Sequence, residues 1–252
     1  RTITFSSLLR ERLGHHIHGE RWANNIKGVL RKEGLLNRPL HIISSNMHSV
    51  LNSLFARKAL AKTLPGKSPL ELYEALSQPG SAKLRELVTS RAVTNIDVQL
   101  FDTARLGPDA CCYELAAEKE ADKPVILVMD YAFGEQAFET IDELLKPYNM
   151  DGKLHYMSVD SISIMGKAGI LEGDKGDLMI PSAHIFEGTA DNYPFRNELC
   201  KSDFEGNGLR VFEGTMVTVL GTSLQNKDIL SFFHDSTWNV IGLEMEGVHY
   251  QK

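Results

Sequence analysis

Residues 123–148 read KPVILVMDYAFGEQAFETIDELLKPY, and this stretch decides the fold class. The run from Val125 to Met129 is short and wholly apolar, which is typical of a strand buried on both faces. The polar segment DYAFGEQ follows as a turn, and the apolar residues after it recur at helical spacing. A strand, a turn and a helix in this order predict a mainly parallel sheet covered by helices.

A second unit of the same kind lies at residues 39–55, PLHIISSNMHSVLNSLF. Its apolar run predicts a buried strand, and Ser44, Ser45 and Asn46 are the turn and N-cap residues that open a helix. Ligands of parallel sheets gather where the strands end. We therefore expect these three residues to share an edge of the sheet with Asp130 and Gly134, where they face an anion, a sugar hydroxyl or water.

The chain as a whole predicts a three-layer α/β/α fold with a mixed, mainly parallel twisted sheet and an N-terminal helical segment. Apolar residues recur at near-helical spacing over residues 6–36. We expect a helical attachment at residues 1–38 and one α/β domain at residues 39–252. A further strand is expected over residues 92–102. His15, His16 and His18 cluster in the attachment, but no set of cysteine or carboxylate ligands completes a metal site.

The composition is that of a globular protein with a full core, at 42% hydrophobic and 24% charged residues. A formal net charge of -6 argues against a nucleic-acid partner, and no apolar run is long enough to cross a membrane. The three cysteines show no CxxC spacing, and residues 1–22 lack the apolar core of a signal peptide. We expect a cytoplasmic protein without a cofactor or a metal.

The second half of the chain carries an ordered series of short motifs. After the strand, turn and helix of residues 125–145 come GKAGIL (166–171), KGDLMIPSA (175–183), VTVLGTSL (217–224) and GLEMEG (242–247). In this order and spacing the series resembles the nucleoside phosphorylase and nucleosidase superfamily. Purine nucleoside phosphorylase, uridine phosphorylase, methylthioadenosine/S-adenosylhomocysteine nucleosidase and AMP nucleosidase belong to that superfamily.

The resemblance implies a nucleoside-phosphorylase-like fold that cleaves the N-glycosidic bond of a nucleoside or nucleotide. Glu246 would accept hydrogen bonds from the ribose hydroxyls, with Met245 packed on the sugar and Glu244 beside it at the strand end. The chemistry is suitable, because a carboxylate holds a vicinal diol and stabilises an oxocarbenium-like sugar. The base would lie against Thr222, Ser223, Leu224, Gln225 and Phe186. Ser44, Ser45, Asn46, Asp130 and Gly134 would lie on the phosphate or nucleophile side.

Two features depart from the superfamily pattern. The acidic residue that protonates the leaving base would lie beyond Lys252, so we expect the sequence to be truncated. The first turn, SSNMHSV, has neither the glutamate of hydrolases nor the arginine of phosphorylases. His48 is then the candidate base, since histidine titrates near neutrality.

The attacking group, water or phosphate, stays open with a lean toward hydrolysis. An enzyme of the N-glycosidase or nucleoside phosphorylase type is the main hypothesis. A non-catalytic nucleoside-binding or sensor protein of the same fold is the alternative. The resemblance also implies a homo-oligomer built on dimers.

Overall fold

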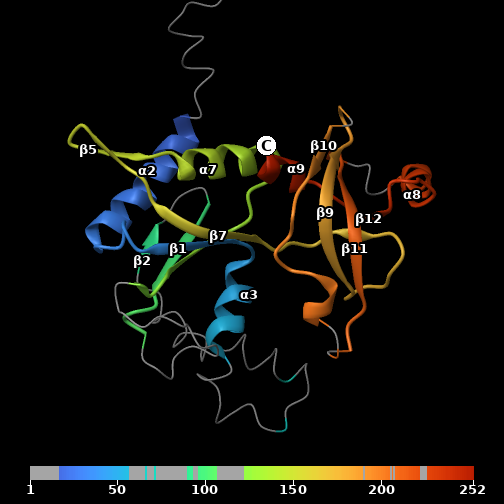
Figure 1. Cartoon of the computed structure of the whole chain (residues 1–252), viewed down its shortest axis with the longest axis horizontal. Coiled ribbons are helices and arrows are strands. Elements are labelled where there is room, and N and C mark those ends of the chain that lie inside the picture. The colour runs from blue at the N-terminus through green and yellow to red at the C-terminus, as the bar shows by residue number, and fades with distance from the viewer. Residues whose placement is uncertain are drawn as a thin grey trace, which may run out of the picture. The chain divides into compact units, whose positions relative to one another are not determined.

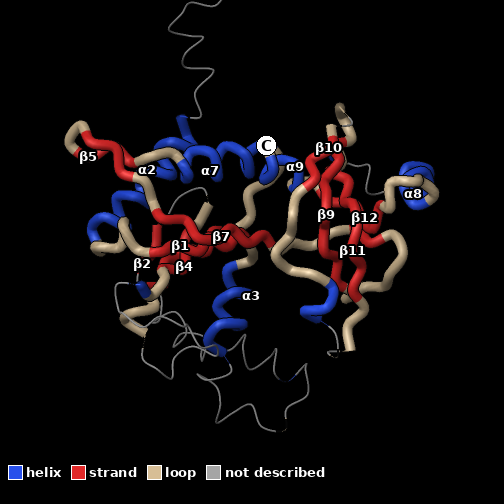
Figure 2. Tube along the Cα trace, viewed as in Figure 1, coloured by secondary structure: helices blue, strands red, loops and turns tan. Residues whose placement is uncertain are grey.

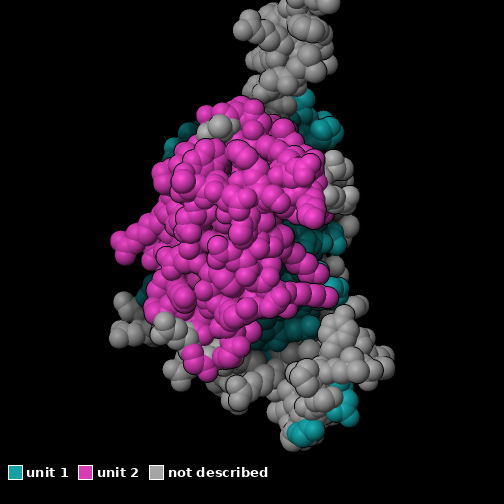
Figure 3. All heavy atoms as spheres, turned by 90° about the vertical axis from the view of Figure 1, so that its right-hand side faces the viewer, with its two compact units in different colours: residues 1–131, 142–166 teal, residues 132–141, 167–252 magenta. Residues whose placement is uncertain are grey.

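A computed structural model gives the fold and describes residues 17–56, 90–92, 96–106, 122–189, 191–204, 208–221 and 226–252, with single positions 66, 71 and 206 (Figure 1). The chain divides into two compact units, shown in different colours in Figure 3. Unit 1 comprises residues 1–131 and 142–166, and unit 2 comprises residues 132–141 and 167–252. Within the described residues, no helix is long and apolar enough to cross a membrane.

Unit 1 contains a five-stranded sheet in the order β2-β3-β4-β1-β7. Strand β1 pairs in parallel with both β4 and β7, whereas β3 pairs antiparallel with β4 and with β2. A separate hairpin joins β5 and β6. The elements are α2 (Ile17–Lys32), β1 (Pro39–Ser44), α3 (Met47–Leu51), the π-helix η1 (Asn52–Ala56), β2 (Ser90–Ala92), β3 (Val98–Asp102), β4 (Val125–Met129), β5 (Tyr148–Met150), β6 (Lys153–His155) and β7 (Ser158–Ile164).

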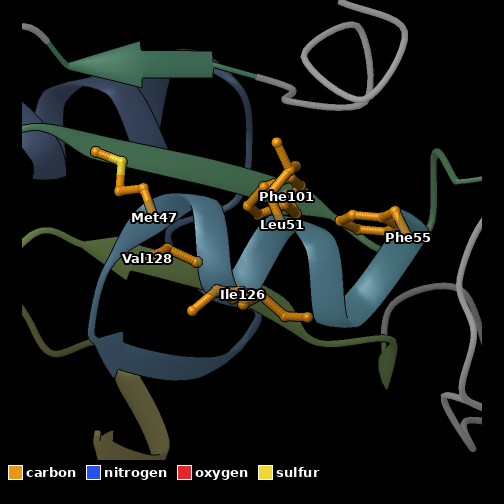
Figure 4. Close-up of a cluster of buried hydrophobic side chains, with 7 residues drawn as sticks. Met47, Leu51, Phe55, Phe101, Ile126 and Val128 are labelled. Carbon is orange, nitrogen blue, oxygen red and sulfur yellow. The ribbon is translucent and has the colours of Figure 1, made fainter. Parts of the chain in front are cut away.

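One hydrophobic cluster packs α3 and η1 against the sheet of unit 1 (Figure 4). The rings of Phe55 and Phe101 lie 5.2 Å apart with a tilt of 36°. Every residue of β3 and β4 is buried, which explains why neither strand alternates between apolar and polar residues. The cluster consists of Met47, Val50, Leu51, Phe55, Phe101, Ile126 and Val128.

Helix α2 is anchored in unit 1 by two buried polar side chains. The indole of Trp22 donates to the carbonyl oxygen of Ile96 at 2.9 Å. The ammonium of Lys27 donates to the carbonyl oxygens of Glu143 and Lys146, both at 2.7 Å. These carbonyls belong to the end of α7 (Glu135–Leu145), so Lys27 places a cation where the helix dipole is negative. Burial lowers the pKa of Lys27 to about 8.

Unit 2 contains the second five-stranded sheet, in the order β10-β9-β11-β12-β8. The three central strands are parallel, and β10 and β8 pair antiparallel at the edges. Figure 2 shows β9, β11 and β12 in red. A hydrophobic cluster that includes Ile185, Val217 and Leu243 packs against α8. The elements are β8 (Gly169–Ile170), β9 (Leu178–Phe186), β10 (Asn192–Pro194), the 3-10 helix η3 (Lys201–Phe204), β11 (Val211–Thr218), α8 (Lys227–His234), β12 (Val240–Glu244) and α9 (Gly247–Gln251).

The predicted mixed α/β class is confirmed, with parallel strands at the centre of each sheet and an N-terminal helix. The strand expected over residues 92–102 is confirmed only in part: β3 covers Val98–Asp102, whereas Ala92 ends β2, which pairs antiparallel with β3. Apolar alternation alone cannot detect such a reversal, because both arms of a hairpin carry the same pattern. Residues 1–16 of the predicted attachment lie outside the described residues, and the boundary at residue 38 stays a prediction.

Replacing Lys27 with methionine is predicted to lower the free energy of unfolding by about 1–3 kcal/mol, because two buried carbonyl oxygens lose their donor. Lys32→Met, an exposed position on the same helix, is the control. The lowered pKa means that the folded state binds this proton more weakly than the unfolded state. The wild-type protein should therefore gain stability as the pH rises from about 8 to about 10.4, because the cost of burying the charged ammonium is relieved over that range. Urea unfolding across that range measures both effects, and an unchanged pH profile in Lys27→Met would contradict the assignment.

Candidate functional site

The parallel strands of unit 2 end in one row. Thr218 is in register with Phe186 on β9 and with Glu244 on β12. The backbone continues the row, since Glu187 N donates to Thr218 O at 3.0 Å and Val219 N donates to Glu244 O at 2.8 Å. This row is the carboxyl edge of the sheet, which is where parallel sheets bind ligands.

A pocket of about 620 Å³ opens at this edge, within unit 2. Its volume lies within the range of small-molecule sites, roughly 300–1,000 Å³. It contains one cation, two carboxylates and two apolar side chains, of which Phe133 is 71% and Met245 37% exposed. The described residues that line it are Phe133, Gly134, Lys167, Glu244, Met245 and Glu246.

Glu246 presents a half-buried carboxylate in this pocket. The residue stands at the N-cap of α9, but its side chain makes no cap hydrogen bond to that helix. The nearby backbone amides of Gly134 and Met245 instead favour the charged form of the carboxylate. Gly134 adopts a φ of 54°, a left-handed conformation that suits glycine, immediately before α7 begins. Burial raises the pKa of Glu246 above its usual value, and the backbone amides partly oppose that rise.

Glu244 is committed to hydrogen bonds within the protein. Its Oε2 accepts from Glu246 N at 2.6 Å and from Gly247 N, and its Oε1 accepts from the hydroxyl of Thr218. Burial raises the pKa of Glu244, and the nearby Glu246 charge adds to the rise, while the three donors oppose it. The two carboxylates of GLEMEG thus occupy different environments.

Phe186 lies at the end of β9 and lines a different pocket, of about 420 Å³, between this strand and α8. Its ring packs edge-on against His249, with centroids 5.6 Å apart, and the ammonium of Lys252 lies 5.2 Å from its centroid. The other predicted base contacts, Thr222, Ser223, Leu224 and Gln225, lie outside the described residues.

The remaining predicted residues of the first turn lie in unit 1. Ser44 is in register with Met129, so residues 44–46 and Asp130 follow neighbouring parallel strands at the same edge, as expected. Asn46 caps α3 by accepting from Ser49 N at 3.1 Å, and Asp130 accepts from Tyr131 N at 2.9 Å. Among the described residues, the buried hydroxyl of Ser45 has no hydrogen-bond partner.

His48, the candidate base, is exposed in α3 of unit 1. Gly134 and Glu246, in contrast, meet within unit 2. No group of three or more histidine, cysteine, aspartate or glutamate side chains in the described parts of the chain is arranged to hold a metal ion.

Sequence reasoning missed the pocket residue Lys167, and it placed Phe133 at the ligand edge of the sheet without assigning it a contact. Both occupy turns that had been recognised, GKAGIL and DYAFGEQ, and both directly adjoin a glycine. A charged or aromatic residue beside a glycine in a turn at a strand end is the signal that could have identified them.

The chain matches the model of one protein family, described as a family of unknown function (DUF6909), over residues 70–252. No curated protein matches the sequence.

Solved structures similar to this chain include futalosine hydrolase of Helicobacter pylori strain 26695, at 11% identity and a TM-score of 0.47, with 86% of this chain and 78% of that chain covered. AMP nucleosidase from Bacteroides thetaiotaomicron VPI-5482 is 13% identical at a TM-score of 0.49, with 92% and 80% covered. The P knowlesi homolog of P falciparum PNP is 12% identical at a TM-score of 0.42, with 85% and 71% covered. Because the family model spans more than half of its residues, the chain belongs to the family of unknown function DUF6909.

Proposed function

We propose that this protein cleaves the N-glycosidic bond of a nucleoside or nucleotide and that the pocket at residues 244–246 holds the sugar. The observation that carries the proposal is the Glu246 carboxylate, which lies in a pocket at the carboxyl edge of parallel strands, near the backbone amides of Gly134 and Met245 and beside the Met245 side chain. A carboxylate with unused acceptor positions suits a vicinal diol, which offers two hydroxyl donors. The apolar faces of Met245 and Phe133 suit the carbon skeleton of a ribose.

The chemistry follows from the charge in this pocket. As the bond between the anomeric carbon and the base nitrogen breaks, its electron pair leaves with the base and positive charge develops on the sugar. A fixed carboxylate close to the ring stabilises that charge more in the transition state than in the ground state. Water or phosphate then forms the new bond to the anomeric carbon, and the base nitrogen takes up a proton.

The residues predicted for the base and for the attacking group keep those roles in the proposal. Phe186 and residues 222–225 would contact the base. Ser44, Ser45, Asn46 and Asp130 would lie on the nucleophile side, with His48 as the base that activates water. A homo-oligomer and a cytoplasmic location likewise stay predictions.

Incubation of the protein with a panel of purine and pyrimidine nucleosides and their 5′-monophosphates tests the activity. Release of free base with free ribose, or ribose 5-phosphate from a monophosphate, indicates hydrolysis. Base release that requires added phosphate and yields a ribose 1-phosphate indicates phosphorolysis. Binding of a nucleoside without release of base would instead support the non-catalytic alternative.

Glu246→Gln is predicted to keep the fold and to weaken ribonucleoside binding or turnover about ten- to a hundredfold, because a charge-assisted hydrogen bond is worth about 1.5–3 kcal/mol. Wild-type protein should prefer a ribonucleoside to its 2′,3′-dideoxy form, and the variant should lose most of this preference. Glu198→Gln, an exposed glutamate of the same unit, is the matched control. Equal ribose preference in wild type and Glu246→Gln would show that the carboxylate does not hold the diol.

Ribonucleoside binding is also predicted to depend on pH through Glu246. Protonation removes the charge that holds the diol, so affinity falls as the pH falls through the pKa of this residue. Burial raises that pKa, so the decline is expected above the usual glutamate value of about 4.3. Calorimetric titration at a series of pH values measures it. A decline of the same size for the dideoxynucleoside, or in Glu246→Gln, would assign the effect to another group.

Lys167→Met is predicted to weaken binding of a nucleoside 5′-monophosphate or of inorganic phosphate by about two- to fivefold and to leave an uncharged nucleoside unaffected. The side chain is exposed, so its ion pair with an anion is worth only about 0.5–1 kcal/mol. Lys175→Met, an exposed lysine of the same unit, is the control. An equal loss for nucleoside and monophosphate would contradict a role of Lys167 in holding an anionic group.

A further inference from the structure

We infer that Thr218 and Glu244 are positioning residues that set the place of the Glu246 carboxylate without touching the ligand. This inference rests on the proposed function of the pocket. In this inference, Glu244 holds the backbone of GLEMEG, and Glu246 binds the sugar.

The first line of evidence is a hydrogen-bond network that closes the turn after β12. The Oε2 atom of Glu244 accepts from the backbone N–H of Glu246, at 2.6 Å, and from that of Gly247. Its Oε1 atom accepts from the hydroxyl of Thr218, on the neighbouring strand. A carboxylate has about four acceptor positions, so three donors leave little capacity for a diol.

The same hydroxyl holds the start of the last helix. Thr218 Oγ1 accepts from Val248 N at 2.9 Å, and Thr218 is completely buried. Helix α9 has five residues, too few for its internal hydrogen bonds to fix its orientation. The hydroxyl therefore serves as donor to Glu244 and acceptor from α9, and it ties both ends of the turn to β11.

Packing restrains the turn from the other side. A Cβ atom added at Gly247 would overlap the imidazole ring of His184 and lie 2.7 Å from Oε1 of Glu244. His184 is itself held, since it is buried and stacks on Phe195 with centroids 5.3 Å apart and an interplanar angle of 5°. The backbone at residue 247 is thus confined between a ring and a carboxylate.

These contacts act on Glu246 through its backbone. Its N–H is held by Glu244, and the next two residues are held by Glu244 and Thr218. Its carboxylate lies near the backbone amides of Gly134 and Met245, which favour its charged form. Such restraint is relevant to function because a misplacement of about 1 Å in a reacting group can cost about a hundredfold in rate.

The test compares Thr218→Val, which loses the hydroxyl, with Thr218→Ser, which keeps it, and with Glu244→Gln. The readout is the ratio of dissociation constants for adenosine and 2′,3′-dideoxyadenosine, with uridine and 2′,3′-dideoxyuridine as a second pair. A ratio measured on one sample cancels any loss of folded protein. We expect this ratio to fall about tenfold in Thr218→Val and in Glu244→Gln. A tenfold change corresponds to the loss of about one hydrogen bond to a charged group. Thr218→Ser should stay within about twofold of wild type.

A double-mutant cycle separates positioning from general stability. If Thr218 acts through Glu246, Thr218→Val should not change the ribose preference further when Glu246→Gln is already present. Unchanged ratios in Thr218→Val and Glu244→Gln, beside a ribose preference in wild type, would overturn the positioning role and leave the proposed function standing. Wild-type protein that binds neither ribonucleoside, or binds ribo and dideoxy forms equally, would overturn both.

Discussion

Parallel pairing of β9, β11 and β12 is the constraint on which the pocket depends. Strands that run in the same direction and in register must end together, and here they end at Phe186, Thr218 and Glu244. The interior of the sheet is apolar, so polar side chains find acceptable surroundings mainly where the chain leaves the strands. The row of strand ends therefore sets which residues can cooperate, although they lie far apart in the sequence.

The two carboxylates at this edge, Glu244 and Glu246, lie within three residues of each other. Burying their charged forms there costs desolvation free energy. Burial raises the pKa of both Glu244 and Glu246, and the charge on Glu246 adds to the rise at Glu244. The hydroxyl of Thr218 and backbone amides offset part of that cost. Titratable groups held in such unfavourable surroundings are concentrated at functional sites, and that tendency favours a ligand role for this pocket over a purely structural one. The edge of unit 1 differs, because the side chains of Asn46 and Asp130 accept hydrogen bonds from nearby backbone amides and His48 is exposed to solvent.

Much of the fold could be predicted from local patterns. The wholly apolar run of Val125–Met129 identified β4 to the residue, because a short continuous apolar run is typical of a strand buried on both faces. The antiparallel pairing of β2 with β3 could not be predicted, because the relative direction of two strands depends on their pairing and not on local composition. In the site, GLEMEG and the turn before α7 were found because they follow strands, but Lys167 was missed because it forms no motif alone.

The sequence by itself determined the strand that begins at Val240, and hence that Glu244, Met245 and Glu246 leave the sheet at its carboxyl edge. Strand periodicity is local, so a few neighbouring residues are enough to specify it. Only the tertiary structure decided that Glu244, rather than Glu246, is bound by hydrogen bonds within the protein. That outcome depends on the hydroxyl of Thr218, 26 residues before Glu244, and contacts between such distant residues exist only once the chain is folded.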